Sequence, residues 1–217
     1  MDRKKVSKNI FRATSVASTV FSMILNFIMF SFDETVAVLY RSSWLALMSF
    51  YYLIIAFMRL SFLLRAGKGL LSRDRERAFL KNYRATGRLI VFMSVIMAMA
   101  VYYMVDNMVS HTYPGILIIF VGLYTLYKVI ASSRNVFKAG KLDSVTALCI
   151  QRINNLDALV SVIVLESAVI TKFSSFRNSF SQDFMLYSGW AICLIVFIMG
   201  ITSIIQSYHR LKMLRMD

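Results

Sequence analysis

Residues 89–105 read LIVFMSVIMAMAVYYMV, a run of apolar and small residues that no charge interrupts. With its flanks it forms the stretch Leu89–Val109, close to the roughly 20 residues that a helix needs to cross about 30 Å of hydrocarbon. Further stretches of this kind occur along the whole chain. The predicted spans are about Ala13–Phe32, Ser43–Leu64, Leu89–Val109, Gly115–Ser133, Thr146–Thr171 and Phe184–Ser207.

The composition indicates a membrane protein rather than a soluble one. Of the 217 residues, 58% are hydrophobic and 17% are charged, whereas about a quarter of the residues in an ordinary soluble domain are charged. Lipid leaves only helices and closed barrels as spanning structures, and continuous apolar runs without two-residue alternation favour helices. We therefore predict an all-α polytopic bundle of six transmembrane helices, forming a single integral membrane domain over residues 1–217.

The basic residues predict the orientation of this bundle. They concentrate before the first span, in the loops 65–88 and 134–145, and after the last span, whereas few lie in the other connections. Cytoplasmic loops of membrane proteins carry the excess of Lys and Arg. Both termini are therefore predicted to be cytoplasmic, in a multi-pass protein of the cell membrane.

The net charge of +14 would suggest nucleic acid as the partner of a soluble protein. Here the positive-inside pattern explains the charge, so the expected partner is the lipid bilayer and not nucleic acid. Loop 65–88 fits two interpretations, contact with anionic lipids at the cytoplasmic face or a solvated determinant of topology. A homo-oligomer and a membrane protein partner also stay open. No cofactor and no metal site is expected, because the cysteines have no metal-ligand spacing.

Short similarities between the spans suggest three repeated helical hairpins. The similar segments are Ser22-Met23-Ile24-Leu25, Ser94-Val95-Ile96-Met97 and Ser161-Val162-Ile163-Val164, each in the middle of an outward-going span. Transport proteins often contain such repeats, with the substrate site at the repeat interface. Chance resemblance is the competing explanation, because serine and aliphatic residues are common in membrane helices.

The segment around the only proline carries a family resemblance. Its residues are Tyr113-Pro114-Gly115-Ile116-Leu117-Ile118, followed later by Tyr124-Thr125-Leu126-Tyr127-Lys128. This pattern of aromatic residues and Pro-Gly resembles a stretch of uncharacterised six-span bacterial membrane proteins. The resemblance covers the third to fifth spans and implies no known activity.

Charged side chains inside the spans are the first candidates for function. A charge at the centre of a bilayer costs at least about 2.5–3.5 kcal/mol, so such a residue usually faces a partner or a wet cavity. Arg59 and Lys128 each lie about 9 Å inside the inner end of a span, within the reach of long side chains that snorkel to the interface. Asp157 lies deep enough in the fifth span to meet either of them.

The fifth span is unusually polar, which predicts that the other helices enclose it. Its polar groups follow two helical stripes, one with Asn154, Asp157 and Ser161 and the other with Arg152, Asn155 and Glu166. For Asp157, a structural ion pair and an ion-binding role are both open. For Glu166, a functional role is favoured, because no span offers it an obvious basic partner.

Glu166 is expected in the outer half of the bilayer, at about the depth of Asn26 in the first span. Short acidic side chains snorkel poorly, which makes Glu166 and Asp157 the leading candidates for ion or proton sites. The candidate ion-binding or substrate-binding residues are Glu166, Asp157, Asn26, Asn154, Asn155 and Ser161, with Arg59, Lys128 and Arg152 as charge partners. No catalytic and no metal-binding residue is expected.

Three classes of function fit these residues. The first is a small transporter or channel for a small ion or solute, and the second is a non-catalytic membrane partner or sensor subunit. An intramembrane enzyme is the third, and it is not the expected class, because the sequence lacks motifs such as H-E-x-x-H and G-x-S-x-G. A solvated cavity at Asp157 or Glu166 would favour transport, whereas a dry, tightly paired interior would favour the partner.

Overall fold

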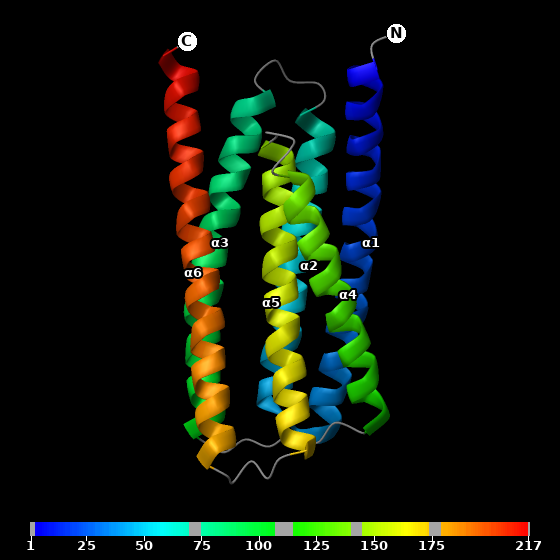
Figure 1. Cartoon of the computed structure of the whole chain (residues 1–217), viewed down its shortest axis with the longest axis vertical. Helices are drawn as coiled ribbons and strands as arrows, with labels where there is room; N and C mark the ends of the chain where they lie inside the picture. The colour runs from blue at the N-terminus through cyan, green and yellow to red at the C-terminus, as the bar shows by residue number, and fades with distance from the viewer. Residues whose placement is uncertain (1–2, 70–74, 107–114, 140–144, 174–178, 217) are drawn as a thin grey trace.

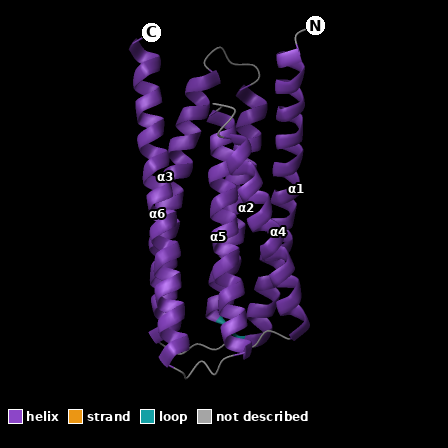
Figure 2. Cartoon of the chain, in the orientation of Figure 1, coloured by secondary structure: helices purple, strands orange, loops and turns teal. Residues whose placement is uncertain are grey.

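The computed structural model describes residues 3–69, 75–106, 115–139, 145–173 and 179–216, and all regular structure in these ranges is helical (Figures 1 and 2). The helices are α1 (Arg3–Tyr40), α2 (Ser43–Gly69), α3 (Arg75–Asp106), α4 (Gly115–Ala139), α5 (Val145–Phe173) and α6 (Ser179–Met216). They stand side by side along one long axis, and the start of α1 and the end of α6 lie at the same end of the bundle (Figure 1).

The helix lengths fit a membrane-embedded protein. Within the described residues, five helices are long and apolar enough to cross a membrane, and α4 contains a shorter apolar stretch, Ile118–Ser133. The predicted all-α fold is therefore confirmed. The sixth crossing, the cytoplasmic termini and the hairpin repeat stay predictions.

The first helix continues past the predicted end of its span at Phe32 and reaches Tyr40. It ends where Arg41 adopts a φ of 50°, the left-handed conformation that often closes a helix. The amide of Ser42 then donates to the carbonyl of Ala37 at 2.9 Å, and the Ser42 hydroxyl accepts from the amide of Leu45 at 3.4 Å. Ser42 thus caps α2, so the connection between α1 and α2 is a tight turn.

Helices α3 and α6 pack closely because glycine replaces side chains at their contact. A Cβ atom on Gly200 would lie 2.6 Å from Cγ2 of Val91 and 3.0 Å from the carbonyl oxygen of Gly87. A Cβ atom on Gly189 would lie 2.6 Å from Cγ1 of Val101. Small residues allow such close backbone approach in membrane helices, where apolar contact with lipid competes with apolar contact between helices.

The other close helix pairs are α1 with α2 and α4 with α5. Helix α5 also contacts α2, α3 and α6, and most of its residues from Ile153 to Ala168 are buried or half-buried. This arrangement agrees with the expectation that the polar fifth helix is enclosed. It also brings one face of α5 to α2 and α4, which supply the buried basic residues Arg59 and Lys128.

Candidate functional site

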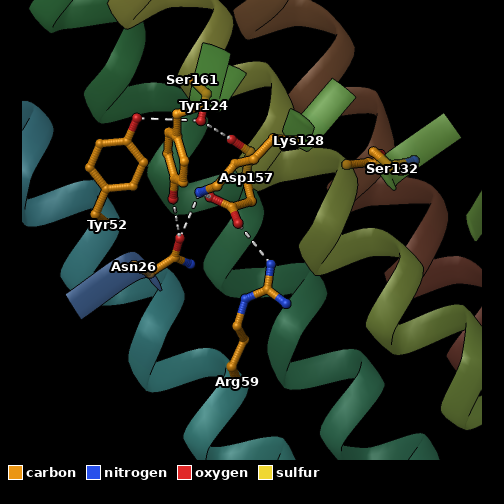
Figure 3. A network of polar contacts seen from close by, with 9 residues as sticks. Asn26, Tyr52, Arg59, Tyr124, Lys128, Ser132, Asp157 and Ser161 are labelled. Atoms are coloured by element: carbon orange, nitrogen blue, oxygen red, sulfur yellow. Dashed lines mark hydrogen bonds and ion pairs between the residues drawn. The ribbon is translucent and has the colours of Figure 1, made fainter. Parts of the chain in front are cut away.

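Asp157 of α5 lies between two basic side chains inside the bundle. Its Oδ2 accepts a hydrogen bond from Nη2 of Arg59 on α2 at 2.7 Å, and its Oδ1 accepts from Nζ of Lys128 on α4. Asp157 and Arg59 are each 2% exposed, and Lys128 is 6% exposed. The contact expected with Arg59 or Lys128 is therefore observed with both, and the three charges form one buried network (Figure 3).

Lys128 is also held by uncharged partners. Its Nζ donates to Oδ1 of Asn26 at 2.6 Å and lies 4.3 Å from the ring centroid of Tyr124 and 4.9 Å from that of Tyr52. The Tyr124 hydroxyl donates to the same Asn26 oxygen at 3.2 Å. A carboxylate, an amide oxygen and two aromatic faces therefore surround the ammonium group, and each interacts favourably with a positive charge.

Hydroxyl groups fix the position of α5 beside this network. The Ser161 hydroxyl donates to the carbonyl of Asp157 at 2.8 Å and accepts from the Tyr52 hydroxyl at 3.3 Å. The Thr125 hydroxyl donates to the carbonyl of Ser161 at 3.1 Å. We call Asn26, Tyr52, Arg59, Tyr124, Lys128, Asp157 and Ser161 together the Asp157 cluster; Figure 3 shows its members converging from α1, α2, α4 and α5.

Two expectations about this region were wrong. Arg59 and Lys128 do not snorkel to an interface, because Asp157 lies within reach inside the bundle and would lose its partners if they did. Asn26 does not belong to the level of Glu166. Because α1 continues to Tyr40, Asn26 lies further from the helix end than expected, and it joins Lys128 in the Asp157 cluster.

A second buried acid, Asp33 of α1, was missing from the predicted site. It is 0% exposed, and neither of its carboxylate oxygens has a hydrogen-bond partner in the described residues. Lys128 and Tyr124 interact with it electrostatically. The sequence does contain a signal for Asp33, because Thr19, Asn26 and Asp33 recur every seven residues and all three are buried. The predicted span ended at Phe32, so Asp33 was not counted among the residues inside it.

None of the remaining predicted residues forms a side-chain hydrogen bond to Asp157 among the described residues. Glu166 is half-buried and accepts a hydrogen bond from the Ser188 hydroxyl of α6. Asn155 accepts from the Ser132 hydroxyl at 2.6 Å, and Arg152 donates through Nε to the Tyr83 hydroxyl at 3.4 Å. Asn154 is half-buried. The first stripe contacts α2 and α4, the second contacts α3, α4 and α6, and only Asp157 and Ser161 contribute to the central cluster.

The arrangement has the chemistry of a charge-balanced interior. Among the described residues, the buried bases Arg59 and Lys128 carry two positive charges against the single negative charge of Asp157, and an ionised Asp33 would bring the sum of these four to zero. No group of three or more His, Cys, Asp or Glu side chains suited to a metal ion occurs among the described residues. The groups that remain can pair, exchange partners and hold a proton or a small ion.

The comparisons with known proteins add no family to this description. No protein-family model matches the chain, and no curated protein is significantly similar to it.

Proposed function

We propose that the chain is a small integral membrane transporter or channel for a proton or small cation, with Asp33 as the exchangeable acid. The observation that carries this proposal is the complete burial of the Asp33 carboxylate without a hydrogen-bond donor in the described residues. An unpaired ionised carboxylate in hydrocarbon costs several kcal/mol, and ionisable residues kept inside membrane spans usually mark ion or proton paths. A proton or a bound cation on Asp33 removes that cost.

The charge of the Asp157 cluster also supports this proposal. When Asp33 is ionised, its charge balances that of the second buried base, and when it is protonated, Lys128 keeps its hydrogen bonds to Asp157 and Asn26. Either form therefore has a compensating interaction. Two states of similar free energy are what a group needs if it is to load and release an ion during transport.

The alternative function is a non-catalytic membrane partner or sensor subunit. It is favoured by Asp157 itself, because each of its carboxylate oxygens already accepts a hydrogen bond from a basic group. In this alternative the buried charges select which helices pack together. Neither candidate includes a catalytic step.

Flux measurements in reconstituted vesicles separate the two functions. We expect proton flux, or sodium or potassium flux, above that of empty vesicles, and we expect Asp33→Asn to abolish it while the thermal unfolding temperature is retained. Glu34→Gln is the matched control, because Glu34 is the neighbouring acid and its carboxylate already accepts from Ser49 at 2.5 Å. It should transport normally.

Glu166→Gln tests the acid that the sequence favoured. Loss of flux in this variant, with Asp33→Asn active, would move the transport site to Glu166. If folded wild-type protein carries no flux of protons, sodium or potassium, the transport proposal is wrong, and the role of a membrane partner or sensor subunit remains.

A further inference from the structure

A groove of about 630 Å³ lies over α5 between α4 and α6, apart from the Asp157 cluster. Helix α5 packs against both neighbours and forms the floor. Arg152, Asn155 and Gln206 lie at one end of the lining, and Leu159, Val162 and Ile198 continue it. Neither Asp33 nor Asp157 is among the lining residues, so an occupant of this groove would be distinct from the ion proposed for Asp33.

On both α5 and α6, the residues that line the groove are polar at one end of the groove and apolar at the other. On α5, Arg152 and Asn155 are followed at helical spacing by Leu159 and Val162. On α6, which runs in the opposite direction along the bundle (Figure 1), Ile198 precedes Gln206. The polar groups therefore gather at the end of the groove where α5 begins, and the rest is apolar. This is the distribution that matches one amphiphile with its head at Arg152.

The polar end is positively charged. Arg152 is the charged residue of the lining, which contains no Asp or Glu. Its Nε donates to the Tyr83 hydroxyl, which in turn donates to Oε1 of Gln206 at 2.9 Å. Among the described residues, no side chain accepts a hydrogen bond from the Nη groups of Arg152. Its side chain is thus positioned through Nε, and the paired Nη donors that bind phosphate remain available.

The apolar part of the groove borders surface that faces lipid. Ile195 and Ile198, which line it from α6, are each 52% exposed, and they lie inside the apolar span of that helix. Tyr83, which contacts Arg152, stands between the exposed basic residues Lys81 and Arg88 on α3. Basic residues concentrate toward the lipid headgroups, so the charged end of the groove is the end nearer the headgroups and its apolar part is the end nearer the middle of the bundle.

We propose that this groove binds one anionic phospholipid of the bilayer, with its phosphate on Arg152 and an acyl chain along Leu159, Val162 and Ile198. The bilayer supplies the occupant directly, because the groove opens on the lipid-facing side. This site goes beyond the transport proposal and does not depend on it. It assigns a lipid ligand to Arg152.

Lipid binding to the purified full chain tests the proposal. Native mass spectrometry in detergent should detect one retained phosphatidylglycerol and weaker retention of phosphatidylcholine. Arg152→Gln should weaken phosphatidylglycerol binding roughly five- to tenfold, the contribution of one basic residue to anionic lipid. Arg88→Gln is the matched control, because it removes an exposed arginine outside the lining, and it should bind as the wild type does.

Val162→Trp provides a second variant that leaves Arg152 intact. The larger side chain fills the apolar part of the groove, so this variant should bind neither phosphatidylglycerol nor phosphatidylcholine. Its unfolding temperature should stay that of the wild type. Equal binding of the two lipids by wild-type protein, or equal effects of Arg152→Gln and Arg88→Gln, would overturn the proposal. A dimer that Val162→Trp dissociates would also overturn it, because the occupant would then be a second copy of the chain.

Discussion

The α3–α6 pair and the Asp157 cluster hold helices together by opposite means. Helices α3 and α6 meet backbone to backbone, where Gly200 and Gly87 leave no room for a side chain. Around Asp157, four helices meet through buried charges, hydroxyls and aromatic rings. Hydrocarbon gives helices little reason to associate through apolar contact alone, so close fit and polar pairing are the two means available. The first serves structure, and the second also provides charges that function can use.

The largest test of this contrast removes the acid of the cluster. Asp157→Leu leaves Arg59 and Lys128 buried without their partner, and we expect it to lower the free energy of unfolding by about 3–5 kcal/mol. A second change, Lys128→Met, should restore part of the loss, because it removes one of the two stranded charges. Reversible unfolding in detergent measures both effects.

The control for Asp157 is Asp183→Asn on α6, an exposed acid whose loss should change stability by less than about 0.5 kcal/mol. Strictly additive effects of Asp157→Leu and Lys128→Met would contradict the structure, because residues in direct contact are expected to couple.

The second test concerns the close fit of α3 and α6. Gly200→Ala places a methyl group against the backbone of Gly87 and the side chain of Val91, and overpacking of this kind costs about 1–3 kcal/mol. Thermal unfolding in the same detergent should therefore detect a lower midpoint. The proposed ion flux should be the same as in the wild type for any protein that remains folded, because the glycine contact lies outside the Asp157 cluster.

Gly122→Ala is the matched control on α4. A Cβ atom there would lie 3.6 Å from Cδ1 of Leu165, an ordinary contact, and alanine is the better helix former by about 0.8–1 kcal/mol. This variant should be neutral or slightly more stable. A destabilisation equal to that of Gly200→Ala would remove the distinction between tightly and loosely packed glycines.

The sequence predicted those features that depend on local composition. Continuous apolar runs predicted the helices, and the polarity of the fifth span predicted its enclosure. The pairing of Asp157 followed from depth, since Arg59 and Lys128 were the basic residues placed inside neighbouring spans. These inferences need only the rise of a helix and the thickness of a bilayer.

Features that depend on helix ends and on helix neighbours escaped prediction. From the sequence, Asp33 was placed in the outer connection, because an acid after an apolar run usually ends a span. In the structure, α1 continues to Tyr40, and the neighbouring helices bury Asp33. For the same reason, Asn26 lies beside Lys128 and not at the expected level of Glu166. The close contact of α3 with α6, which are distant in the sequence, depends on how the whole bundle closes.

The smallest test asks whether hydrogen bonds matter at the α3–α6 contact. The buried Ser207 hydroxyl of α6 donates to the carbonyl of Leu80 on α3 at 2.7 Å. Ser207→Ala should cost only about 0.6 kcal/mol, the average for hydrogen bonds between membrane helices. Ser203→Ala is the control, because its hydroxyl donates within α6, to Met199 at 2.8 Å, and links no second helix. If Ser207→Ala lowers the unfolding free energy as much as Gly200→Ala does, then polar pairing holds this contact as well. Both contacts would then depend on polar pairing, and they would differ only in that the Asp157 cluster uses charged groups.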